Sequence, residues 1–80
     1  MYQQYMGQNN IYEINGYLVK INKDKFESNK MYSERVLYII NNLKKYKKTI
    51  DIKDNLMEQI RLSRIYVNQK FLHCKYSLTA

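Results

Sequence analysis

The sequence predicts a mainly α domain of the α+β class, in which an N-terminal β-hairpin packs on three short helices. An Asn-Gly pair separates two runs of β-prone residues within 11–21, which is the strongest local signal for a hairpin. Apolar residues then recur at helical spacing within about 33–46, which predicts the first helix. The spacing resumes within about 52–61 and 64–74 and changes phase between them. This change predicts a tight turn between a second and a third helix.

Residues 10–80 are expected to form a single small domain, and residues 1–9 a flexible arm. The arm carries no Lys or Arg and has no sustained apolar period. A chain of 80 residues without proline has room for a small core and is too short for a deep cleft of enzyme size.

The hairpin is expected to close through a type I′ turn. Gly16 accepts the positive φ that this turn requires, and the asparagine before it tolerates that φ. The turn would place Ile14 opposite Tyr17 and Tyr12 opposite Val19, which gives the hairpin one apolar face. Because an isolated hairpin is marginal in water, this face should pack on the first helix.

A polar connector at 22–30 should be held by a single anchoring ring, Phe26. The first helix follows, with Ser33 as its N-cap and Glu34 near the positive end of its dipole. Its core-facing stripe is expected to contain four apolar side chains at helical spacing, namely Val36, Ile39, Ile40 and Leu43.

The second helix is expected to start at Asp51, with Asp54 in a capping-box arrangement. Leu56 and Ile60 share a face, and Leu62 interrupts their period. Ser63, a residue type preferred at N-caps, would then open the third helix, in which a second stripe runs through Tyr66, Val67 and Phe71. Val67 and Phe71 would point inward. The tail after residue 71 fits either a helical extension or a strand.

The pattern Leu56-x-x-x-Ile-x-Leu-Ser-x-x-Tyr-Val-x-x-x-Phe71 resembles the helix-turn-helix unit of bacterial AraC-type transcription regulators. The segment 38–45 resembles the first helix of that family, so the similarity covers about residues 35–72. It implies that the third helix is a recognition helix that enters the major groove of double-stranded DNA. The family carries two such units, whereas this sequence shows one, so either one unit suffices as a homodimer or the fold has another role.

The net charge agrees with a polyanionic partner. The chain has 14 Lys and Arg against 7 acidic residues, a formal charge of +7, and such an excess favours nucleic acid through counterion release. The alternative is coding bias, because Asn, Lys, Ile and Tyr, which are abundant here, have codons rich in A and T.

Two groups of side chains are the candidate DNA contacts. On the third helix, Arg64 could bind guanine and Asn68 or Gln69 adenine, with Ile65 beside them, while Tyr66 and Lys70 could reach phosphates. The second group follows the first helix and could bind phosphates. It consists of Lys44, Lys45, Lys47 and Lys48. The alternative for both groups is that they are simply solvated, since lysines also suit the C-terminal end of a helix.

Nothing in the sequence predicts an enzyme or a cofactor. The two glycines, Gly7 and Gly16, cannot form a phosphate-binding loop. One histidine, His73, and one cysteine, Cys74, cannot supply a zinc ligand set. An RNA-cleaving protein that works through Tyr, Lys and Arg stays open. A membrane span and an export signal are both missing from the pattern, which predicts a place in the cytoplasm of a bacterium or host cell.

The sequence therefore predicts a small basic DNA-binding transcriptional regulator. The alternative is an inhibitor from a phage or mobile element, of the anti-defence type, that binds and blocks a host protein or nucleoprotein complex. Such a protein could use the same fold, because function lies in the surface.

Overall fold

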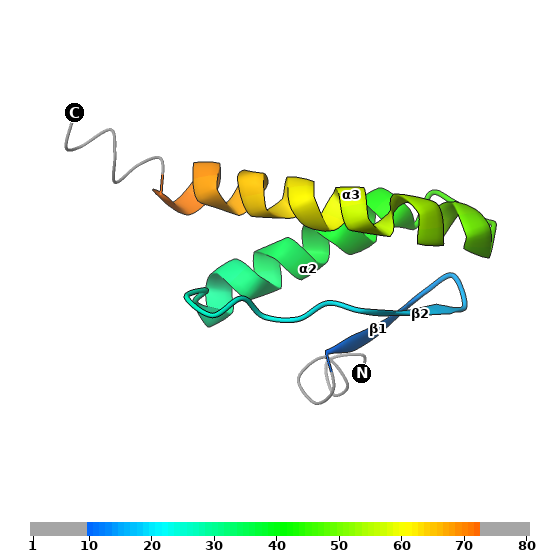
Figure 1. Ribbon diagram of the computed structural model, residues 1–80, viewed down its shortest axis with the longest axis horizontal. Helices are drawn as coiled ribbons and strands as arrows, with labels where there is room; N and C mark the ends of the chain where they lie inside the picture. Colours follow the sequence, from blue (N-terminus) through cyan, green and yellow to red (C-terminus); the bar gives the residue numbers. More distant parts are fainter. Residues whose placement is uncertain (1–9, 73–80) are drawn as a thin grey trace.

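The computed structural model describes residues 10–72 (Figure 1). Its elements, in order, are β1 (Ile11–Ile14), β2 (Tyr17–Lys20), α2 (Asn29–Leu43), α3 (Thr49–Val67) and a π-helical end, η1 (Asn68–Leu72). In Figure 1, α2 runs between α3 and the hairpin. The expected arm at 1–9, His73, Cys74 and the tail lie outside the described residues. The mainly α, α+β class is confirmed, but the described chain has two long helices where three were expected.

The hairpin forms with the expected register. Ile14 lies opposite Tyr17 and Tyr12 opposite Val19. The turn has positive φ at both central positions, 49° at Asn15 and 86° at Gly16, as a type I′ turn requires.

The first long helix starts earlier than predicted. The hydroxyl oxygen of Ser28 accepts a hydrogen bond from the backbone N–H of Met31, at 3.1 Å, so Ser28 is the N-cap of α2. The prediction of Ser33 was wrong because the polar segment before it contains a second serine that also satisfies the cap. The predicted stripe is confirmed, since Val36, Ile39 and Leu43 are buried and Ile40 packs against them.

Helix α2 ends at Leu43, before the predicted Tyr46, because the hairpin turn captures the following carbonyls. The side-chain amide of Asn15 donates to the carbonyl oxygens of Lys44 and Tyr46, at 2.8 and 2.7 Å. The turn residue thereby ties the loop between the helices to the hairpin. Local propensity cannot reveal this contact, which joins positions about 30 residues apart.

The predicted turn between a second and a third helix is wrong. Helix α3 is continuous through Leu62 and Ser63, and the chain remains helical as η1 after Val67. Its N-cap is Lys48, which makes no side-chain capping bond, whereas the predicted cap, Asp51, lies within the first turn.

Ser63 explains why the apolar spacing was misleading. This serine is fully buried, and its hydroxyl donates to the carbonyl oxygen of Ile60, at 2.6 Å, an interaction that mid-helix serines often make. Once Ser63 is counted as an inward residue, the inner face has regular helical spacing with no change of phase. It consists of Ile52, Leu56, Ile60, Ser63 and Val67.

The core lies where the apolar face of the hairpin, α2 and the first turns of α3 meet. It contains Tyr12, Ile14, Val19 and Ile21 from the hairpin and its exit, Val36, Ile39 and Leu43 from α2, and Ile52 from α3. The hairpin thus packs on the first long helix as expected. Within residues 10–72, every helix is too short or too polar to cross a bilayer.

Candidate nucleic-acid interface

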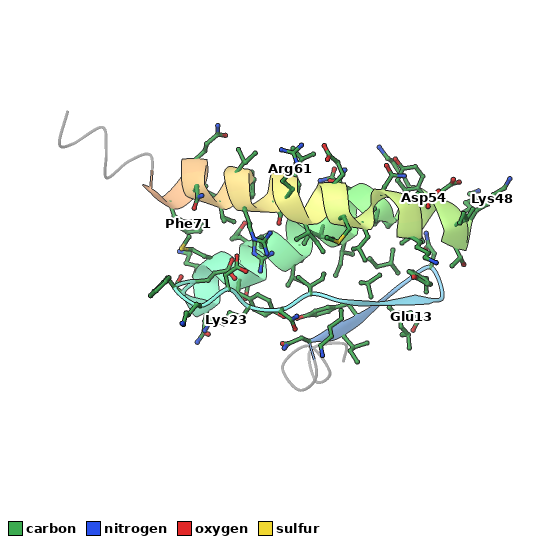
Figure 2. The ribbon with its side chains drawn as sticks, viewed as in Figure 1. Glu13, Lys23, Lys48, Asp54, Arg61 and Phe71 are labelled. Carbon is green, nitrogen blue, oxygen red and sulfur yellow. The ribbon has the colours of Figure 1, made fainter. Side chains whose placement is uncertain are left out.

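Five exposed lysines gather where the two helices are joined. Lys44 and Lys45 directly follow α2, and Lys47 and Lys48 lead into α3. Lys53 follows in the second turn of α3 and is exposed as well. We call these five residues the lysine end, which is marked by Lys48 in Figure 2.

The fold holds the backbone of the lysine end in place. Its carbonyl groups are bound by Asn15, as described above, and the ring of Tyr46 packs against the core. The ammonium nitrogen of Lys45 lies 5.2 Å from the centroid of that ring, within the range of a cation–π contact. The lysine side chains thus extend from a fixed loop rather than from a free tail.

The electrostatics of the lysine end favour an anion. Residues 44–54 contain five lysines and two aspartates, Asp51 and Asp54, a difference of three positive charges. The N-terminus of α3 lies within this segment, and no side chain caps it. Its free N–H groups and the helix dipole add partial positive charge.

Half of the other basic side chains in residues 10–72 are engaged with carboxylates. Four cations form ion pairs elsewhere in the described chain: Arg35 with Glu27, Arg61 with Glu58, Arg64 with Asp24, and Lys70 with Glu34. Within residues 10–72, no lysine of the lysine end forms an ion pair with a carboxylate. A phosphate can therefore bind these ammonium groups without breaking an ion pair.

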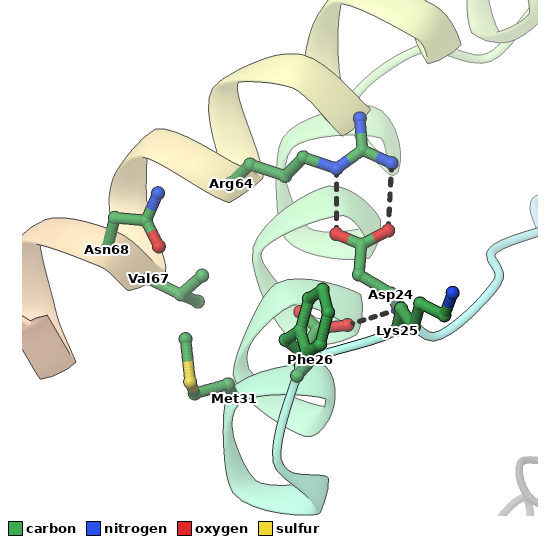
Figure 3. Close-up of a pocket in the computed structure, with 8 residues that line it drawn as sticks. Asp24, Lys25, Phe26, Met31, Arg64, Val67 and Asn68 are labelled. Carbon is green, nitrogen blue, oxygen red and sulfur yellow. Dashed lines mark hydrogen bonds and ion pairs between the residues drawn. The ribbon is translucent and has the colours of Figure 1, made fainter.

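Arg64, the predicted guanine contact, is held by a carboxylate. Its Nε and Nη2 donate to the two carboxylate oxygens of Asp24, at 2.8 and 3.1 Å (Figure 3). These hydrogen bonds lower the pKa of Asp24, against the opposing effect of its burial. They also raise the pKa of Arg64. Binding a base would require this pair to separate.

The two predicted phosphate contacts on the same helix are also occupied. The ring of Tyr66 stacks on that of Tyr38, with centroids 4.9 Å apart. Lys70 donates to Glu34 at 3.0 Å and lies 3.5 Å from the Tyr66 hydroxyl. These contacts fasten the end of α3 to α2.

Ile65, Asn68 and Gln69 are exposed, as a groove-reading surface would need. However, Ile65 lies within α3, and the other two lie in the π-helical end. The predicted recognition helix therefore does not exist as a separate element. The ten predicted contacts divide into a lysine group that is free and a C-terminal group that is partly engaged.

Sequence reasoning missed one residue of the lysine end and one residue that positions it. Lys53 was overlooked because the predicted second helix began next to it and the lysine run seemed to end at Lys48. Asn15 was assigned only a turn role, although its side chain also positions the loop.

No family model matches the chain, and searches of curated proteins and solved structures find no significant match. The resemblance to AraC-type regulators therefore has no independent support from relatives.

Proposed function

We propose that this protein binds double-stranded DNA by placing its lysine end against the phosphate backbone, and that it regulates transcription by occupying DNA. The observation that carries this proposal is the clustering of unpaired positive charge. Five exposed lysines without a carboxylate partner in residues 10–72 lie within the single segment 44–53, whereas Arg35, Arg61, Arg64 and Lys70 are paired. Free ammonium groups release condensed counterions when they meet phosphates, and this release drives non-specific binding.

Phosphate contacts position a protein on DNA but do not read its sequence. The side chains expected to read bases include Arg64, which is bound to Asp24. We therefore expect weak sequence preference from one chain. A homodimer would bring two lysine ends to one duplex and enlarge the interface.

The test is a titration of a fluorescent DNA duplex with the protein over a range of salt concentrations. Five phosphate contacts would give a slope of log K against log salt of roughly −4.5, from about −0.9 per contact. Lys45→Ala should lower the affinity equally for different sequences and reduce the slope by about one.

Lys30→Ala is the matched control. It removes the same charge from the opposite end of α2, about 21 Å from Lys44 at 1.5 Å per residue. Equal effects of the two substitutions would mean that only net charge matters, and the lysine end would not be the interface. A slope near zero would refute binding through the phosphate backbone.

A further inference from the structure

A tight turn at residues 24–27 presents an aromatic ring to solvent. The backbone N–H of Glu27 donates to the carbonyl oxygen of Asp24, at 3.1 Å, which leaves Lys25 and Phe26 at the tip. Phe26 is 94% exposed. The prediction that its ring anchors the connector is therefore wrong. A large ring placed in water has an unfavourable hydration free energy that burial in a partner would relieve.

Two arginines, Arg35 and Arg64, hold this turn through hydrogen bonds to its first and last residues. Arg35 is fully buried, and its Nε and Nη2 donate to the carboxylate of Glu27, at 2.6 and 3.0 Å. The same Nη2 donates to the carbonyl oxygen of Asn22, at 2.6 Å. Arg64 binds Asp24 at the other end of the turn. Both ends of the turn are therefore fixed by charged hydrogen bonds.

The buried pair of Arg35 and Glu27 is not explained by stability alone. A buried ion pair often adds no stability over apolar side chains of similar size, because desolvating both charges is costly. Within the described chain, Nη1 of Arg35 is in addition buried without a hydrogen-bond partner, which adds to this cost. What the network does supply is a fixed position for Phe26. A fixed position lowers the entropy lost when the ring is bound.

A hollow of about 300 Å³ lies beside the ring (Figure 3). Its lining includes three apolar side chains. They are Met31 from the start of α2, Val67 from the end of α3, and Phe26. This volume is at the lower end of the range for binding pockets. It suits a single bulky side chain beside the Phe26 ring.

The charges around the hollow indicate what would occupy it. The carboxylates of Asp24 and Glu27 are neutralised by the two arginines. Lys25, the remaining charged side chain of the lining, is exposed and has no carboxylate within ion-pair distance in the described residues. The lining thus carries one unpaired positive charge beside an apolar centre.

We propose that Phe26 and the adjacent hollow bind a segment of a partner protein that presents one large apolar side chain flanked by Asp or Glu. The apolar side chain enters the hollow against the Phe26 ring, and an acidic neighbour meets Lys25. A protein segment fits better than nucleic acid, because the two arginines at the turn are already bound to carboxylates and the hollow is apolar. This site is separate from the lysine end and does not depend on the proposed DNA binding.

The test begins with selection from a displayed library of random peptides on the full protein. Selected peptides should share one aromatic or large aliphatic residue with acidic neighbours. Their affinities, measured by fluorescence anisotropy, should fall roughly 30-fold for Phe26→Ala, the loss typical of a hot-spot residue. Lys25→Glu should weaken binding further as salt is lowered, because it reverses the charge beside the hollow.

Leu18→Ala is the control, since Leu18 is an exposed apolar side chain on β2 and should leave peptide affinity unchanged. Because Phe26 and Leu18 are both exposed, neither substitution threatens folding. Three results would overturn the proposal: peptides without an acidic consensus, peptides that bind Phe26→Ala as tightly as the native protein, or failure to select any binder. A single-stranded oligonucleotide whose binding is lost with Phe26→Ala would instead assign the ring to base stacking.

Discussion

Replacing Arg35 by methionine tests the role of the buried charge network. Methionine retains the apolar part of the side chain and removes the guanidinium group. Glu27, only 9% exposed, would then lose its two hydrogen bonds from Arg35 and keep a buried negative charge. Removing one partner of a buried pair typically costs about 3–5 kcal/mol.

This loss is large for a chain of 80 residues, whose free energy of unfolding should be about 4–12 kcal/mol from the usual value per residue. One kcal/mol shifts Tm by about 4–8 °C in domains of this size. Arg35→Met should therefore lower Tm by at least about 12 °C, as measured by circular dichroism or calorimetry.

Two further variants separate the ion pair from general effects. Glu27→Gln combined with Arg35→Met removes both charges and keeps an oxygen for the backbone N–H of Asp24, so it should recover part of the loss. Arg61→Met breaks an exposed pair with Glu58 and should change stability far less than Arg35→Met does, because solvent screens exposed ion pairs. If Arg35→Met and Arg61→Met had equal effects, the buried pair would not brace the turn.

Three other predictions follow from the helix caps and from titrating groups. Ser28→Ala should lower the free energy of unfolding by about 1 kcal/mol because it removes an N-cap. Ser63→Ala, inside α3, should change it by less than about 0.5 kcal/mol. A larger loss for Ser63→Ala than for Ser28→Ala in urea denaturation would indicate that Ser63 is a helix cap after all. The lowered pKa of Asp24 means that its stabilising effect is present above the ordinary value of 3.8 and is lost as pH falls below it. Asp24→Asn should therefore flatten the acid side of a plot of stability against pH, and an unchanged slope would contradict the pairing with Arg64. Burial and the hydrogen bond with Tyr12 raise the pKa of Tyr32, so stability should fall as pH rises above about 10. Tyr32→Phe should reduce this fall. If stability fell equally with pH in the variant and the native protein, the pKa of Tyr32 would not be raised by folding.

The hairpin could be predicted in detail because its determinants are local. The Asn15-Gly16 pair fixes the turn type, and alternation on either side fixes which residues face inward. The core stripe of α2 was accessible for the same reason, since Val36, Ile39 and Leu43 follow helical spacing. The class of the fold follows from these two elements.

The error in α3 came from treating burial as a property of apolar residues alone. Ser63 is small enough to lie in the interior, and its hydroxyl is satisfied by the helix itself. Counting it as polar broke a regular stripe into two and produced a turn. A serine at a capping position and a serine at a close packing position look alike in one sequence.

The candidate sites were only partly predictable because they depend on pairing between distant residues. Lysines 44, 45, 47 and 48 could be singled out from their run in the sequence. That Arg64 binds Asp24, 40 residues away, could not be predicted, and this pairing changes what Arg64 can do. Phe26 was misjudged because a single ring in a polar segment usually anchors it, whereas here the buried Arg35 performs that role.

The most direct test of the DNA interface is to titrate the isotope-labelled protein with a short DNA duplex and follow its backbone amides by NMR. If the lysine end binds phosphates, amide signals from residues 44–53 should shift most, together with that of Asn15, and the shifts should diminish as salt is raised. Signals from Arg64 to Lys70 should change little. The largest shifts at Arg64, Asn68 and Gln69 would instead show that the end of α3 reads DNA and that the lysine end is only solvated.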